Sequence, residues 1–296
     1  VDVDSIEAIN KSTWSEKWAE YRKRPGSFIM FIFVHLATLI TVLSIGFLLV
    51  YVLVKGIPNL NADIFSWEYT SDNCSLVPAL INTVYMTLLS LLIAGPIGIF
   101  AAIYLVEYAK TGNKLVGVVR ITAETLTGIP SIVYGLFGML FFTNACGLRL
   151  SLISGALTLA IMVLPVIMRT TEEALMAVPK SYREGSFGLG AGKLRTVFKV
   201  VLPSAVPGIL SGIILATGRI VGETAALIYT AGSVAKMATK LTDSTRTLAV
   251  HMYLLSKEGL HTDQGYATAV VLLVLVVLIN FASDKIAGKV AADKAN

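Results

Sequence analysis

The stretch Glu184 to Pro203, EGSFGLGAGKLRTVFKVVLP, decides how the rest of this chain is interpreted. Its twenty positions lie between long apolar segments and hold four charged residues: Glu184, Lys193, Arg195 and Lys199. A charged side chain at the centre of a bilayer costs about 2.5 to 3.5 kcal/mol on insertion scales. The stretch is therefore predicted to be a soluble segment between two membrane spans.

The apolar content of the whole chain predicts a polytopic membrane protein. Of the 296 residues, 55% are hydrophobic and 15% are charged, and the mean hydropathy is +0.75. A spanning helix needs about twenty mostly apolar residues. Segments that meet this requirement are Phe28 to Val54, Val77 to Tyr104, Val118 to Thr143, Leu150 to Met168, Ser204 to Ala231 and Tyr266 to Ala282. We therefore expect an all-α fold with six transmembrane helices in a lipid bilayer.

The positive charges predict the orientation of these spans, because Lys and Arg are enriched in cytoplasmic loops. Sixteen of them lie in the two tails and in the loops 107–120 and 170–203, whereas the three loops on the other side hold six. Both termini and the stretch Glu184 to Pro203 are thus expected in the cytoplasm. This bias accounts for the net charge of +5, so nucleic acid is not expected as a partner.

The spacing within the opening stretch resembles the EAA motif of ABC importer permeases, E-A-A-x3-G-x9-I-x-L-P. The residues in register with it are Glu184, Gly185, Ser186, Gly190, Leu202 and Pro203. In that family the segment is a short cytoplasmic coupling helix that docks on a separate ATPase. The resemblance therefore implies a type I ABC importer permease fold and assigns these six residues to ATPase coupling. Gly and Ser replace the two Ala, which keeps the residues small but lowers helix propensity.

Further blocks resemble the PstA type of phosphate ABC permease. They are YLVEY, PSIVYGLFG, RTTEEALMAVPKSYREGSFGLGA and RIVGETAAL, and they cover most of residues 77 to 232. The resemblance implies a heterodimeric pore with a PstC-type permease subunit, an ATPase dimer that holds ATP and Mg, and an extracytoplasmic phosphate-binding protein. It also implies that this chain is a transport subunit, with no catalytic residue, cofactor or ATPase site of its own.

Two arginines and one glutamate are the candidates for substrate binding or translocation: Arg169, Arg219 and Glu223. Arg219 and Glu223 are four residues apart in an apolar segment, so on a continuous helix they share a face and can form an ion pair. From the residues alone, a structural pair and a transport site both remain open. The resemblance implies that the arginines contact phosphate, since guanidinium groups suit oxyanions. Glu223 would then hold Arg219 while the pore is empty.

Other kinds of site find little support in the sequence. GLGAGK, residues 188–193, lacks the first Gly and the final Ser or Thr of a phosphate-binding loop, so no nucleotide site is expected. The histidines, His35, His251 and His261, match no metal-ligand spacing, and no metal site is expected. A permease for another oxyanion, such as sulfate or molybdate, is the alternative function. A secondary transporter or channel is the alternative of a different class, and it would leave EGSFGLGAG unexplained.

The remaining segments give four expectations. The tail Asp4 to Arg24 places its aromatic residues on one helical face, which predicts an amphipathic helix on the membrane surface. The first apolar segment is too long for a signal peptide and is expected to be retained. Cys74 and Cys146 both fall in outward loops, where a disulfide between them is a hypothesis. The chain divides into a tail, 1–27, a first helix and outer loop, 28–76, a permease core, 77–282, with the coupling loop 170–203, and a basic tail, 283–296.

Overall fold

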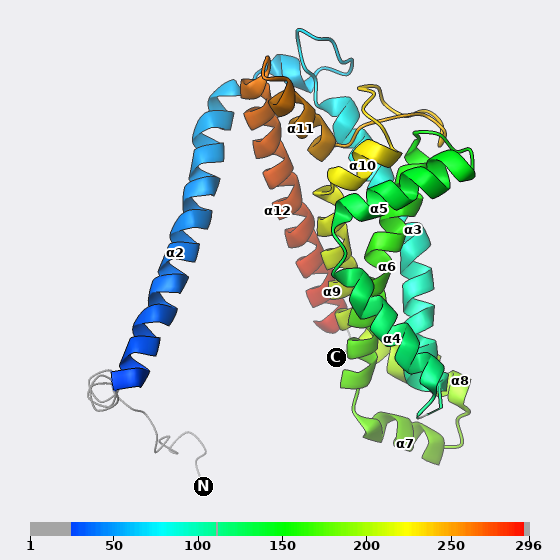
Figure 1. Ribbon diagram of the computed structural model, residues 1–296. Helices are drawn as coiled ribbons and strands as arrows, with labels where there is room; N and C mark the ends of the chain where they lie inside the picture. The colour runs from blue at the N-terminus through cyan, green and yellow to red at the C-terminus, as the bar shows by residue number, and fades with distance from the viewer. Residues whose placement is uncertain (1–24, 111, 293–296) are drawn as a thin grey trace. The chain divides into compact units, whose positions relative to one another are not determined.

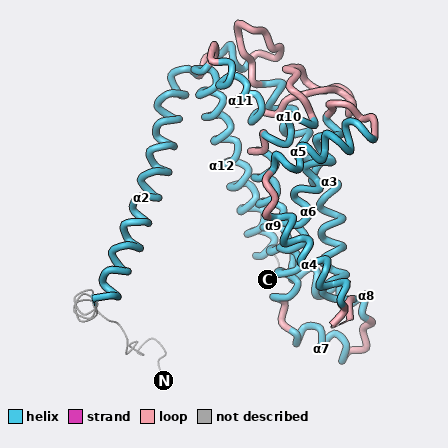
Figure 2. Tube along the Cα trace, viewed as in Figure 1, coloured by secondary structure: helices cyan, strands magenta, loops and turns pink. Residues whose placement is uncertain are grey.

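The computed structural model describes residues 25–110 and 112–292, and every regular element in these ranges is a helix (Figure 1 and Figure 2). Five helices are long and apolar enough to cross a membrane, and a bent pair makes six if it counts as one span. The predicted all-α polytopic fold is confirmed. The amphipathic helix predicted for Asp4 to Arg24 lies outside the described residues.

The first helix, α2 (Pro25–Gly56), contains all described residues of the first of two units, which ends at Val54. It contains the predicted span Phe28 to Val54. Its polar side chains bond to the helix itself: the Thr38 hydroxyl, for example, donates to the carbonyl oxygen of Val34 at 2.8 Å. An internal bond of this kind satisfies a hydroxyl where water is absent.

Residues 55–296 form a second unit, a helical bundle. Its long helices are α3 (Val77–Ile103), α6 (Leu152–Ala177), α9 (Leu202–Val221) and α12 (Thr262–Ala292). α6 packs against both α3 and α9, and α12 packs against α9. α12 runs from one end of the bundle, beside α11 (Leu248–Glu258), towards the other end, where α7 (Lys180–Gly188) and α8 (Lys193–Thr196) lie (Figure 1).

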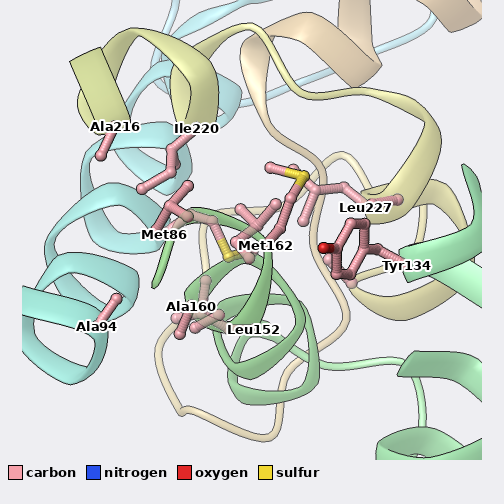
Figure 3. Packing of buried hydrophobic residues seen from close by; sticks show 14 of the residues in the cluster. Met86, Ala94, Tyr134, Leu152, Ala160, Met162, Ala216, Ile220 and Leu227 are labelled. Carbon is pink, nitrogen blue, oxygen red and sulfur yellow. The ribbon is translucent and has the colours of Figure 1, made fainter. Parts of the chain in front are cut away.

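The core of this bundle is apolar and depends on small residues for close packing. Met86 of α3, Met162 of α6 and Ile220 of α9 are buried in one cluster (Figure 3). A side chain at Gly155 of α6 would come within 2.8 Å of the Met86 methyl group. Glycine at such positions lets membrane helices approach closely, which replaces the hydrophobic driving force that lipid does not supply.

The third predicted span, Val118 to Thr143, is not a single straight helix. α4 (Lys114–Thr127) and the helix that starts with α5 (Ser131–Gly138) meet at an angle of 104°. Pro130 lies at the break, and proline lacks the N–H that a helix interior needs. The hydroxyl of Tyr134 donates to the carbonyl oxygen of Leu126 at 2.7 Å, which satisfies one backbone group freed by the break.

Two other predicted spans end at different residues in the structure. α6 continues to Ala177, beyond the predicted end at Met168. The charged residues after Met168 end the apolar run, but they are good helix formers and do not end the helix. The predicted span Ser204 to Ala231 is interrupted after Val221, and a short helix, α10 (Ala225–Thr230), follows.

The hypothesised disulfide between Cys74 and Cys146 is not formed. Cys74 and Cys146 are both free thiols, the first buried and the second exposed. The sulfur of Cys74 lies 3.4 Å from the carbonyl oxygen of Ser71, within its own loop. Burial raises the pKa of this thiol, because the low-dielectric surroundings disfavour the thiolate.

A buried polar cluster lies at the α11 end of the bundle. The guanidinium of Arg246 stacks over the ring of Tyr69, 4.5 Å from its centroid, and the ring of His251 meets Tyr69 edge-on at 6.0 Å. His251 is fully buried on α11. Burial, and then the positive charge of Arg246, lower the pKa of His251 to about 3, while the backbone of Cys74 opposes this shift. His251 is therefore neutral at physiological pH.

Candidate functional site

The stretch that resembles the EAA motif forms a helix, a turn and a second helix at one end of the bundle. Glu184, Gly185 and Ser186 lie on α7, and Leu202 and Pro203 begin α9. Between them, α8 continues through a π-helical stretch, η6 (Val197–Val201), without a break into α9. The residues singled out by the motif therefore lie on two helices that a turn connects.

Gly190 makes the turn. Its φ angle is +81°, a left-handed conformation that side chains other than glycine rarely adopt. The hydroxyl of Ser186 lies 2.8 Å from that of Thr196, so α7 and α8 are also joined across the turn. The Ser that replaces the second Ala of the motif thus has a structural contact that Ala lacks.

One side of α7 remains available to a partner. Glu184 and Gly185 are exposed, and a side chain at Gly185 would meet no atom within 4 Å. Apolar side chains are exposed beside them: Leu189 is 92% exposed, and Phe187 is exposed as well. A helix with small residues and exposed apolar side chains at the end of a membrane bundle is suited to close contact with another protein.

The other side of α7 contacts the membrane helices through Arg183, which the sequence analysis did not single out. Its guanidinium forms an ion pair with Glu107, in η4 (Tyr104–Tyr108), the π-helical end of α3. The structure thus gives Glu107 a structural role. The two residues are 76 positions apart. Beyond their opposite charges, nothing in the sequence indicated that they meet.

Arg169 lies on α6 in a network of charges with α4. Its Nε donates to Oε1 of Glu173 at 3.1 Å, and its Nη1 lies 3.7 Å from Oε1 of Glu124. Beside it, Arg120 pairs with Glu172. These charges line a cavity of about 260 Å³ together with Ala123, Met168 and Met176. Since charged groups on membrane helices face water or protein rather than lipid, this face of α4 and α6 is not a lipid-contacting face.

Arg219 and Glu223 are not paired, which corrects the ion pair expected from their spacing. α9 ends at Val221, so the two residues are not on one continuous helix. The carboxylate of Glu223 instead accepts a hydrogen bond from the backbone N–H of Ala226 at the start of α10. Glu223 is buried, and no ion pair among the described residues includes it or Arg219.

Arg219 lines a cavity of its own between α9 and α12. This cavity measures about 690 Å³ and is also lined by Ser211, Ile214, Leu215, Gly218 and Asn280. Arg169 is not among its residues, so the structure does not bring the two candidate arginines into one cavity. In the part of the chain that is described, no group of three or more His, Cys, Asp or Glu side chains is arranged to hold a metal ion.

Residues 94–292 match the family described as the binding-protein-dependent transport system inner membrane component. The chain belongs to this family. The matched region includes α7, the bent pair α4–α5 and both candidate arginines, so the site described above is part of the permease that the family defines. The description of the family also indicates one kind of partner, because its members belong to transport systems that depend on a binding protein.

Curated relatives agree with the assignment. A probable ABC transporter permease, YqgI of Bacillus subtilis, is 33% identical over 83% of this chain and 90% of its own length. The phosphate transport system permease protein PstA 1 of Mycobacterium tuberculosis is 35% identical, over 70% of this permease and 68% of its own length. PstA of Xylella fastidiosa is 40% identical, over 60% of this permease and 62% of its own length. The predicted resemblance to PstA-type permeases is confirmed.

Solved structures show the same fold. An inward-facing form of the MetNI methionine ABC transporter aligns with a TM-score of 0.58 at 25% identity, over 73% of this permease and 95% of that chain. A bacterial alginate ABC transporter, in complex with a periplasmic protein bound to an alginate pentasaccharide, aligns with a TM-score of 0.67. The alignment covers 91% of this permease and 97% of that chain. The latter is 13% identical, so it is similar in fold alone.

Proposed function

We propose that this permease imports inorganic phosphate into the cytoplasm as the PstA-type subunit of an ATP-driven transporter. The observation that carries the proposal is the similarity to relatives named phosphate transport system permease protein PstA, at 35 to 40% identity. Sulfate or molybdate is the alternative cargo, since guanidinium groups bind these oxyanions in a similar way. A secondary transporter or channel gives no reason for the helix-turn-helix arrangement around Gly190.

In this proposal, α7 docks on an ATPase dimer, which binds ATP and Mg. The exposed side of α7, with Glu184 and Gly185, supports such a contact because nothing in the described bundle covers it. Gly190 shapes the turn after α7, and Leu202 and Pro203 lie at the start of α9, within the continuous helix that begins at Lys193. The chain itself performs no covalent step and contributes binding, shape and movement. ATP binding displaces α7, and hydrolysis allows it to return.

The second membrane subunit in this proposal is a PstC-type permease, and a phosphate-binding protein delivers the substrate from outside. The excess of Lys and Arg in the tails and in loop 170–203 supports a cytoplasmic position for both termini and for α7. The α11 end of the bundle, which lies opposite α7, then faces the exterior (Figure 1). It is the end at which the binding protein delivers phosphate.

Arg169 and Arg219 are the proposed phosphate contacts. Arg219 lines an open cavity and forms no ion pair within the described residues, so its charge is available to an anion. Arg169 is 56% exposed, and exposed ion pairs such as its contacts with Glu124 and Glu173 contribute only about 0 to 1 kcal/mol. Phosphate can therefore displace those carboxylates. Glu223 acts indirectly, because it shapes the break between α9 and α10.

The test is uptake of radiolabelled phosphate into vesicles that contain the permease, its partner subunit and the ATPase, with ATP inside and the binding protein outside. ATP-dependent uptake that excess sulfate or molybdate leaves unchanged is the expected result. Inhibition by either anion would change the cargo, and uptake without ATP would exclude an ABC importer.

Variants of Arg219 test its proposed contact with phosphate. Arg219→Gln is expected to lower uptake at least tenfold, because it removes a charged hydrogen-bond donor of about 1.5 to 3 kcal/mol. Arg219→Lys keeps the charge but loses the planar fork, so an intermediate rate is expected. Equal rates for Arg219→Gln and the parent permease, in complexes that assemble equally, would exclude the contact.

A further inference from the structure

One guanidinium connects the coupling helix to two membrane helices. Nε and Nη2 of Arg183 donate to Oε1 of Glu107 at 3.0 and 2.7 Å. Nη1 donates to the carbonyl oxygen of Val178, and Nη2 also donates to that of Leu175, both at 2.9 Å. The start of α7, the end of α6 and η4 at the end of α3 therefore meet at one side chain. We call Arg183, Glu107 and these two carbonyl groups the Arg183 junction.

The Arg183 junction is better shielded than the other ion pairs in the described residues. The side chains of Arg183 and Glu107 are 18% and 9% exposed, whereas each of the other three pairs includes at least one side chain that is about half exposed or more. A shielded pair is screened less by salt and holds its geometry more firmly than a surface pair. The planar fork of arginine also fixes direction, which a single-point contact does not.

A second contact joins α8 to η4, the π-helical end of α3. Lys193, at the start of α8, places its ammonium group 5.2 Å from the ring centroid of Tyr108. Tyr108 is the neighbour of Glu107 in η4. Arg183, before the turn at Gly190, and Lys193, after it, thus both contact η4. The chain between α6 and α7 is only Val178 and Pro179, and the Arg183 junction bridges this short connection.

We propose that Arg183 is a positioning residue that makes α7, η4 and the end of α6 move as one body. A displacement of α7 is then passed through Glu107 to α3, which lines the core of the bundle beside α6. This inference rests on the proposed function, in which an ATPase displaces α7. It gives Glu107 a role in transport although Glu107 touches neither phosphate nor the exposed side of α7.

The first test compares Glu107→Gln and Arg183→Lys in the complete complex, reconstituted with its ATPase and binding protein. Glu107→Gln keeps the shape and an acceptor oxygen but removes the charge. Arg183→Lys keeps the charge but cannot reach Glu107 and both carbonyl groups in the fixed geometry of the fork. Each variant is expected to lower the phosphate moved per ATP hydrolysed about tenfold, which is an ordinary size for the coupling between two sites.

Lys114→Gln is the matched control, because Lys114 is exposed at the start of α4 and lies outside the junction and the motif. It removes one charge and is expected to leave the ratio of phosphate to ATP unchanged. Assembled Glu107→Gln and Arg183→Lys complexes that transport with the parent ratio would overturn the proposal. Variants that fail to assemble would overturn it as well, since the junction would then serve folding alone.

A second readout does not depend on the cargo. Spin labels at Tyr104→Cys in η4 and Ser181→Cys in α7, in a chain with Cys74→Ala and Cys146→Ser, report the distance between the two elements. This distance is expected to stay constant when ATP binds, and to change on ATP binding once Glu107→Gln is added. A constant distance in both chains contradicts the junction. A response to Glu107→Gln in a complex that moves no phosphate supports the junction and contradicts the proposed cargo.

Discussion

The carboxylate of Glu223 lies 3.0 Å from the backbone N–H of Ala226 and caps the first turn of α10. Glu223, which its spacing marked as the partner of Arg219, therefore bonds to the backbone three residues further along the chain. The cap also explains why a carboxylate is buried in an otherwise apolar segment, since it satisfies an N–H that a helix start leaves without a partner.

Substitutions at Glu223 are expected to separate this cap from any role of the charge. Glu223→Ala removes the acceptor and should lower the free energy of unfolding by about 1 kcal/mol, the usual cost of a lost cap. Glu223→Gln keeps an acceptor oxygen and should lose less. Thermal unfolding of the purified complex in detergent measures both. Equal stability of Glu223→Ala and the parent would contradict the cap.

Gly190 is expected to tolerate only residues that adopt left-handed conformations. Gly190→Val should lower uptake while ATP hydrolysis continues, because the left-handed backbone costs about 1 to 2 kcal/mol for an L-residue and the turn after α7 would shift. Gly190→Asn should retain more uptake, since Asn enters this conformation more easily. Uptake and ATP hydrolysis measured on the same vesicles give the comparison. Equal losses in the two variants would contradict backbone strain as the cause. Steric crowding is not expected to contribute, because no atom lies within 4 Å of a side chain built at Gly190.

Gly135 is predicted to be intolerant of even a methyl group. A side chain there would come within 2.7 Å of the backbone Cα of Ala226, so α5 and α10 would have to separate. Gly135→Ala should destabilise the permease by about 1 to 3 kcal/mol, as overpacked cores do. Gly117→Ala is the control, because Gly117 lies inside α4 with no atom within 4 Å of a built side chain. Gly117→Ala should be neutral or stabilising in the same unfolding assay.

The free energy of unfolding is expected to fall in acid because His251 is buried in its neutral form. Its pKa is about 3 in the folded chain against 6.5 in the unfolded chain, so the unfolded state binds the proton more readily. The contribution is complete above pH 6.5 and is lost progressively as the pH falls from there to 3. Between pH 7 and pH 5 the loss amounts to about 2 kcal/mol. Unfolding measured over this range should be less pH-dependent in His251→Gln, and an unchanged slope would contradict the assignment.

The sequence predicted the parts of the fold that depend on apolar length and on local turns. The spans Phe28 to Val54 and Val77 to Tyr104 agree with α2 and α3 to within a few residues, because hydropathy changes sharply at their ends. The turn at Gly190 was also predictable, since glycine is the residue that a left-handed turn requires.

The breaks and the long-range contacts were not predictable in the same way. Only Gly222, Glu223 and Thr224 interrupt the apolar run after Val221, and an interruption this short does not by itself show that α9 ends there. The ion pair expected for Arg219 and Glu223 assumed a continuous helix, and it failed for that reason. Arg183 and Glu107 meet only because α3, α6 and α7 come together at one end of the bundle, which the spacing of two residues in one sequence does not reveal.

The bend at Pro130 has a consequence for how the chain is built. The helix that starts with α5 runs from Ser131 to Ala145 and is at most about 22 Å long, too short to cross the roughly 30 Å of hydrocarbon by itself. The groups against which it packs come later in the chain: Gly138 lies against Thr158 of α6, and Gly135 lies against Ala226 of α10. During synthesis, α5 therefore enters the membrane before its packing partners exist. Its contact with Ala226 can form only after the ribosome has made some ninety further residues.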